Sequence, residues 1–144
     1  MKLLNVLIAI LLFILSLLFS SCDDELSIKT DYDYSIEMLP IPRKLGKGES
    51  VLLEFSIIRE EYYSETAFKF RYFQMEGKGT LYDSRRQRLS MNTLYKIDKD
   101  DFVLVYQSDS DETQQLDFVF FDNFGKKVDY SIKFGTFNEK EEEE

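Results

Sequence analysis

The sequence predicts an all-β protein, an immunoglobulin-like antiparallel β-sandwich of about seven short strands. Apolar and polar residues alternate with period two in about seven stretches between residues 32 and 134. Turn-forming residues separate these stretches at fairly even spacing, and no long helical pattern follows residue 31. The chain also holds 13 Phe and 9 Tyr, which favour strands. A small open barrel is the alternative, and a chain with one Cys and no Trp cannot have the Cys-Trp-Cys core of antibody domains.

The first two alternating stretches show how strand faces are assigned. In residues 32–38 the inward row is aromatic and aliphatic, and Pro40-Ile41-Pro42 ends the strand because proline cannot donate to a ladder. In residues 51–57 the inward side chains are all apolar. Leu52 and Ile58 lie on the opposite face, which predicts a strand with two partly covered faces. The predicted inward rows of these two strands are Tyr32, Tyr34, Ile36 and Met38, and Val51, Leu53, Phe55 and Ile57.

The remaining rows follow the same alternation. They are Phe68, Phe70 and Tyr72; a short strand at residues 80–82; Phe102, Leu104 and Tyr106; Leu116, Phe118 and Phe120; and Val128, Tyr130, Ile132 and Phe134. Phe73 breaks the outward polarity of its strand. Within residues 89–100, Leu94 and Ile97 fit either a short helical turn or a short strand. Turns are predicted at 44–48, 75–79, 108–113 and 122–125 from their Gly, Asn, Asp and Ser residues.

The N-terminus has the layout of a bacterial signal peptide, predicted to span residues 1–21. Lys2 supplies a positive charge, residues 3–19 are almost wholly apolar, and Ser20-Ser21 precede a cysteine. Phe19-Ser20-Ser21-Cys22 resembles a lipobox, although Phe19 stands where leucine is usual. This resemblance implies lipidation of Cys22 and cleavage before it. The apolar run is near the lower limit for a membrane-spanning helix, so a transmembrane anchor is the alternative.

The mature chain divides into three parts. Residues 22–31 form a tether, residues 32–137 the β-sandwich domain, and residues 138–144 an acidic tail expected to be disordered. Two or three acyl chains on Cys22 would anchor the protein stably, because a single chain binds a membrane only reversibly. Asp23-Asp24-Glu25 resembles the lipoprotein export signal of Bacteroidota, and a solvated spacer is the other interpretation. We expect lipid anchoring in the outer membrane, facing the periplasm or the cell surface.

Composition argues against most catalytic and nucleic-acid-binding functions. The formal net charge is −9 and the pI about 4.6, which disfavours phosphate contacts to nucleic acid. The chain has no His, which removes Ser-His-Asp and Cys-His catalysis and His-ligated zinc. With one Cys, no disulfide forms within the chain. We therefore predict no enzyme activity, no cofactor, no metal site and no small-molecule substrate.

Three charged clusters are candidate sites. Asp98, Asp100 and Asp101, and then Asp109, Asp111 and Glu112, match no EF-hand pattern and are interpreted as exposed acidic turns. The cluster Arg85-Arg86-Gln87-Arg88 fits either a solvated loop or a contact for acidic partners or lipopolysaccharide phosphates.

Several segments in order resemble the TraQ family of conjugative-transposon proteins of Bacteroidota. They are Cys22-Asp23-Asp24-Glu25-Leu26, Met38-Leu39-Pro40-Ile41-Pro42, Lys47-Gly48-Glu49, Arg71-Tyr72-Phe73-Gln74, Gly77-Lys78-Gly79-Thr80-Leu81, Tyr106-Gln107-Ser108, Gln114-Gln115 and Phe121-Asp122-Asn123-Phe124-Gly125. Residues 83–93 and the acidic tail fall outside this pattern. The resemblance implies an immunoglobulin-like sandwich and a lipoprotein accessory to conjugative DNA transfer, and it implies no active site.

Two functions follow as hypotheses. The first is a non-enzymatic component of a conjugation apparatus that binds envelope or conjugation-apparatus proteins. The second is a surface module for glycans or host protein that uses Tyr62, Tyr63 or Phe73. The segments at residues 71–74 and 121–125 are interpreted as a core strand and a turn, with a contact surface as the alternative.

Overall fold

The computed structural model describes residues 1–8, 29 and 31–137. The predicted cleavage site, Cys22 and the tail at 138–144 lie outside these residues, so the domain boundaries and the lipidation of Cys22 stay predictions. No helix in the described part of the chain is long and apolar enough to span a membrane.

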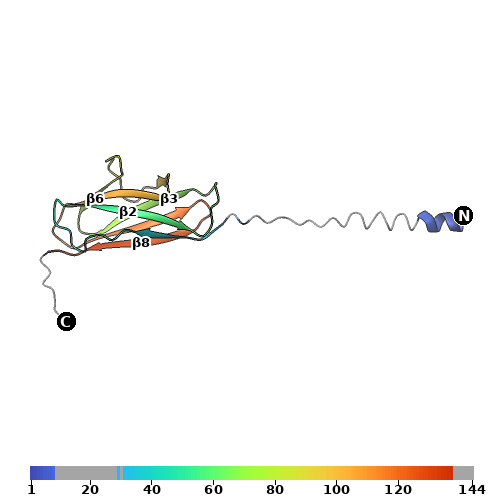
Figure 1. Ribbon diagram of the computed structural model, residues 1–144, viewed down its shortest axis with the longest axis horizontal. Coiled ribbons are helices and arrows are strands. Elements are labelled where there is room, and N and C mark those ends of the chain that lie inside the picture. Colours follow the sequence, from blue (N-terminus) through green and yellow to red (C-terminus); the bar gives the residue numbers. More distant parts are fainter. Residues whose placement is uncertain (9–28, 30, 138–144) are drawn as a thin grey trace, which may run out of the picture.

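Within the described residues, eight strands form two four-stranded antiparallel sheets (Figure 1). In chain order they are β1 (Tyr34–Met38), β2 (Ser50–Arg59), β3 (Phe68–Glu76), β4 (Gly79–Tyr82), β5 (Tyr95–Ile97), β6 (Asp101–Ser108), β7 (Gln114–Asp122) and β8 (Lys127–Phe134). The first sheet has the order β1-β2-β6-β4, and the second has the order β5-β3-β7-β8. These orders match the A-B-E-D and C-F-G sheets of immunoglobulin domains, with β5 added beside the C strand. The predicted sandwich class is confirmed.

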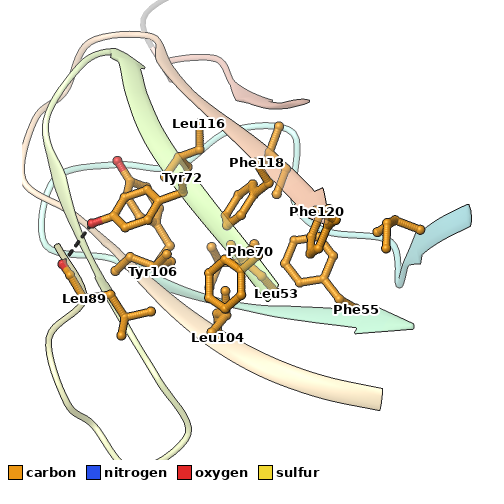
Figure 2. Close-up of a cluster of buried hydrophobic side chains, with 14 of the residues drawn as sticks. Leu53, Phe55, Phe70, Tyr72, Leu89, Leu104, Tyr106, Leu116, Phe118 and Phe120 are labelled. Atoms are coloured by element: carbon orange, nitrogen blue, oxygen red, sulfur yellow. Dashed lines mark hydrogen bonds between the residues drawn. The ribbon is translucent and has the colours of Figure 1, made fainter. Parts of the chain in front are cut away.

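The predicted inward rows meet between the two sheets as an aromatic core. Phe55 on β2 lies 5.1 Å from Phe118 and 5.5 Å from Phe120 on β7, measured between ring centroids. Phe70 on β3 lies 6.3 Å from Phe118. Figure 2 shows these rings packed together in the middle of the sandwich, with Leu53 and Leu104 beside them. Such pairs each add about 0.5–1.5 kcal/mol beyond the apolar area that they bury.

Two sequence expectations change in the structure. Residues 95–97 form a strand, β5, in addition to the seven predicted ones, so the segment that fitted either a helical turn or a strand is a strand. Ile97 is buried in it, and Leu94 is exposed just before it. The expectation that both faces of residues 51–57 are partly covered is wrong. Leu52 and Ile58 remain 56% and 45% exposed, because no described element packs on the outer face of the first sheet.

The strand register defines two ends of the sandwich. At the tether end lie residues 29 and 31–33, which precede β1, and the connections 60–67, 98–100 and 123–126. At the far end lie the connections 39–49, 77–78 and 109–113, together with residues 135–137. The described chain therefore enters at one end of the sandwich and leaves at the other (Figure 1).

Candidate interaction surface

Ion pairs hold the segment before β1 against the tether end. The Lys126 ammonium lies 3.0 Å from the Asp31 carboxylate and 2.5 Å from the Asp33 carboxylate. The hydrogen bond and charge of Lys126 lower the pKa of Asp33, and both carboxylates raise the pKa of Lys126. Lys29 pairs with Glu60 on the same end at 3.4 Å. The point at which the tether meets the domain is therefore fixed beside the β7–β8 turn.

A buried polar network occupies the far end of the core. The Tyr106 hydroxyl donates to Gln114 Oε1 at 2.5 Å, and it also lies 3.2 Å from Gln74 Oε1. Gln114 Nε2 donates to Ser108 Oγ at 2.8 Å and to the Leu45 carbonyl at 3.4 Å. Tyr106, Ser108 and Gln114 are fully buried, and burial raises the pKa of Tyr106. A buried network of this kind is stabilising because each polar group has a partner.

Two glycines beside this network are required by close packing. A Cβ on Gly79 would lie 2.2 Å from the Tyr106 hydroxyl oxygen and 2.3 Å from the nearest atom of its ring. Gly77 has φ +70°, and a Cβ there would lie 2.6 Å from the Gln114 side chain. Gly77-Lys78-Gly79 is therefore a tight β3–β4 connection that seals the network, as its interpretation as a turn predicted.

The network brings together several of the sequence segments that resemble the TraQ family. Ser108 N–H donates to the Glu49 carbonyl at 2.9 Å, and Gly48 N–H donates to the Ser108 carbonyl at 2.8 Å. Residues from the segments at 47–49, 71–74, 77–81, 106–108 and 114–115 thus converge on one end of the sandwich. The residues that form the network build the fold, so the contact surface must be sought among side chains that point outward.

The outer face of the second sheet carries an arginine between two aromatic rings. The register aligns Arg71 on β3 with Val119 on β7, next to the pair of Lys69 and Phe121. The Arg71 guanidinium lies 5.5 Å from the Phe73 ring centroid and 5.2 Å from the Phe121 ring centroid. Such cation–π contacts contribute about 0.5–1 kcal/mol each at exposed sites. The structure thus brings together two segments that the sequence left open between core and contact surface.

Further contacts hold this arginine in place. Its Nη1 donates to Asn92 Oδ1 at 3.3 Å, and Asn92 N–H donates to the Tyr72 carbonyl at 3.0 Å. Arg71 Nε is buried and has no hydrogen-bond partner within the described part of the chain. Tyr72 and Phe70 on the same strand face the core, as the alternation predicted. The segment at residues 71–74 therefore contributes to both the core and the outer face.

A shallow hollow of about 510 Å³ lies beside the arginine on this face. Its floor is apolar, and its rim carries two carboxylates and a hydroxyl. Ser131 Oγ donates to Asp117 Oδ1 at 2.8 Å, and Lys127 pairs with Asp129 at 3.1 Å. The hollow is lined by Phe73, Met75, Asp117, Phe118, Val119, Asp129 and Ser131. Aromatic rings, Met and Arg on a rigid sheet are the residues enriched at protein–protein interfaces.

The basic cluster lies in the connection between β4 and β5, on an ordered turn. Asp83 Oδ1 accepts hydrogen bonds from the backbone N–H groups of Arg85 at 2.9 Å and Gln87 at 2.8 Å. Arg86 adopts φ 62°, and its N–H donates to the Asp83 carbonyl. Arg85, Arg86 and Arg88 are exposed, so the cluster is presented to solvent at the side of the sandwich.

The acidic clusters do not converge on a common point. Asp98 pairs with Lys96, Asp100 with Arg59, and Asp101 accepts from Ser56. No group of three His, Cys, Asp or Glu residues suited to a metal ion occurs among residues 1–8, 29 and 31–137. Each carboxylate of the first cluster thus has its own protein partner.

The aromatic residues proposed for glycan contact are split between two places. Tyr62 is 75% exposed, and Tyr63 packs 6.0 Å from Phe124, both on connections at the tether end. Phe73 lies on the outer face of the second sheet, where it pairs with Asp117. The structure therefore builds no shared aromatic platform from these three residues.

Sequence comparison identifies the family. The sequence pattern of the TraQ conjugal transfer protein family matches residues 5–139. The chain belongs to this family. No characterised protein in the curated comparison matches the chain.

Solved structures of Bacteroides proteins share the TraQ-family fold seen here. A lipoprotein from Bacteroides thetaiotaomicron is 37% identical with a TM-score of 0.69, over 83% of this chain and 92% of that one. A conjugative transposon lipoprotein from Bacteroides eggerthii is 30% identical with a TM-score of 0.67, over 72% of this chain and 98% of that one. A conjugate transposon protein from Bacteroides vulgatus is 28% identical with a TM-score of 0.68, over 84% of this chain and 99% of that one.

Proposed function

We propose that this TraQ-family protein is a non-enzymatic accessory component of a conjugative transposon DNA-transfer apparatus. In this proposal it is anchored in the outer membrane by lipid on Cys22 and acts by binding another envelope protein. Family membership and the conjugative-transposon relatives support the transfer role. The relatives described as lipoproteins support the anchor.

The observation that carries the binding role is the outer face of the second sheet. Arg71 is held between Phe73 and Phe121 on a sheet whose register is fixed by the core, so these groups are ordered before a partner arrives. Preorganised aromatic and arginine side chains lose little entropy on binding and dominate interface energies.

The proposal is tested by conjugation frequency in a clean deletion strain. We expect the wild-type gene to restore transfer and Cys22→Ala to fail. Phe73→Ala removes a central ring from the hollow and is expected to lower transfer about tenfold or more, since a hot-spot residue contributes about 2 kcal/mol or more. Phe124→Ala is the matched control, because it removes the same ring from the β7–β8 turn at the tether end.

Three results would count against the proposal. If the deletion strain transfers normally, the protein has no role in conjugation. If Cys22→Ala restores transfer fully, the lipid anchor is unnecessary. If Phe73→Ala and Phe124→Ala give the same conjugation frequency and both variants keep the wild-type melting temperature, the hollow is not the contact surface.

A further inference from the structure

The outer face of the first sheet carries an exposed apolar band. The register places Leu52, Val105 and Tyr82 side by side on β2, β6 and β4. Leu52 is half-exposed, and Val105 and Tyr82 are partly exposed. Val103 lies two residues along β6 from Val105 and points to the same side. This band faces solvent, although it has the composition of a strand core.

An acidic band runs next to the apolar one. Glu37, Ser56 and Asp101 lie in one row across β1, β2 and β6, and Glu54 pairs with Val103 between the two bands. Glu37, Glu54 and Asp101 are exposed. The outward positions of these four strands hold three carboxylates and, within this described sheet, no Lys or Arg. The basic residue of these strands, Arg59, instead has its guanidinium 4.7 Å from the Phe68 ring centroid at the tether end of β2.

The opposite face of the sandwich has the opposite charge. Five basic side chains lie at outward positions of the second sheet, against the three carboxylates Glu76, Asp117 and Asp129. A partner that suits one face is therefore repelled by the other. The five basic residues are Lys69, Arg71, Lys96, Lys127 and Lys133.

We propose that the outer face of the first sheet docks a basic segment of another protein, one that carries apolar side chains beside a row of Lys or Arg. Neighbouring rows on a sheet face are about 7 Å apart. Glu54 is one row from Leu52 and Val105, and the row of Glu37 and Asp101 is two rows away, so the segment must place its cations about 7–14 Å from its apolar contacts. Burial of Leu52, Val105 and Tyr82 supplies affinity, and the carboxylates favour a partner with positive charge. This face is distinct from the hollow beside Arg71, so the domain has two surfaces of different specificity.

The test is site-specific photocrosslinking in donor cells that express the full chain. A benzophenone amino acid replaces Val105, and a matched chain carries it at Ser131 on the outer face of the second sheet. We expect a crosslinked product from position 105 that position 131 does not give. Mass spectrometry of that product should identify a segment in which Lys or Arg accompanies apolar residues.

Charge reversal separates specific docking from chance proximity. Glu37→Lys with Glu54→Lys should lower the yield of the product about tenfold while the melting temperature is kept, because neither side chain is buried. Glu61→Lys with Glu112→Lys changes the net charge equally at other exposed sites and should leave the yield unchanged.

The proposal is overturned by any of four results. Position 105 gives no product; the crosslinked segment lacks basic residues; the segment comes from a second copy of this chain; or both charge-reversed pairs reduce the yield equally. A basic segment from a protein unrelated to conjugation would leave this docking proposal standing and count against the transfer role instead.

Discussion

Removal of one buried hydroxyl measures what the far-end network contributes to stability. Tyr106→Phe keeps the ring, which stacks 5.9 Å from Phe134 at an interplanar angle of 6°. It deletes the donor to Gln114 Oε1, and the Gln114 side chain is fully buried. An acceptor left unsatisfied in this position costs about 1–3 kcal/mol. We therefore expect the free energy of unfolding to fall by about 2 kcal/mol.

The assay is urea unfolding of the lipid-free chain, followed by circular dichroism. With an m-value of about 1.5 kcal/mol/M, a loss of about 2 kcal/mol lowers the urea midpoint by about 1.3 M. The control Tyr62→Phe removes an exposed hydroxyl and should change stability by less than about 0.5 kcal/mol.

A double-mutant cycle tests whether the effect passes through Gln114. In a Gln114→Leu background the carbonyl acceptor is gone, so Tyr106→Phe should cost little, and the coupling energy should be about 1–2 kcal/mol. A Tyr106→Phe loss below about 0.5 kcal/mol, or strictly additive effects of the two substitutions, would refute the network as described.

Three further predictions follow from local geometry. Gly79→Ala should destabilise the protein by about 3 kcal/mol or more, because the new Cβ meets a buried ring. Gly48 has φ +83° and nothing within 4 Å of its Cβ position, so Gly48→Ala should cost only about 1–2 kcal/mol. Thermal unfolding measures both losses, and equal losses would contradict the packing argument. Burial raises the pKa of Tyr34 to about 12. The stability that the protonated Tyr34 hydroxyl contributes is therefore full below its unfolded-state pKa of about 10 and is lost as pH rises through about 12. Absorbance titration at 295 nm should show one ionisation step at high pH in the wild type that is missing in Tyr34→Phe. Because Lys126 lowers the pKa of Asp33, that ion pair should persist below pH 3.8 and be lost as pH falls through the lowered pKa; carboxyl NMR of Lys126→Met should show the Asp33 pKa returning toward its ordinary value.

The strand rows were predictable because burial on a sheet alternates strictly. Phe55, Leu104 and Phe118 all fall on the inward parity of their strands, and a shift of one residue would expose every one of them. β5 was not predictable with the same clarity, because it has three residues and is defined by its pairing with β3. The covering of Leu52 and Ile58 was predicted wrongly, because apolarity alone does not say whether a second layer exists.

The candidate surface was visible in the sequence only in part. Phe73, Val119 and Phe121 are apolar at outward positions, which is a signal that period-two alternation can detect. That Arg71 stands between Phe73 and Phe121 depends on the register of β3 against β7, which joins residues far apart in the chain. The far-end network escaped sequence reasoning because Gln114 and Ser108 look like ordinary loop residues until their burial is known.

The entry of the chain at one end and its exit at the other also set how the domain would bear mechanical load. A pull between a membrane anchor and the end at which the chain leaves the domain acts along the strands. β1 is an edge strand that pairs antiparallel with β2 over Tyr34 to Met38. Tension from the tether would therefore try to slide β1 along β2 and load all their hydrogen bonds together, which resists force far better than opening them one after another. The Lys126 ion pairs lie at the point where that force enters.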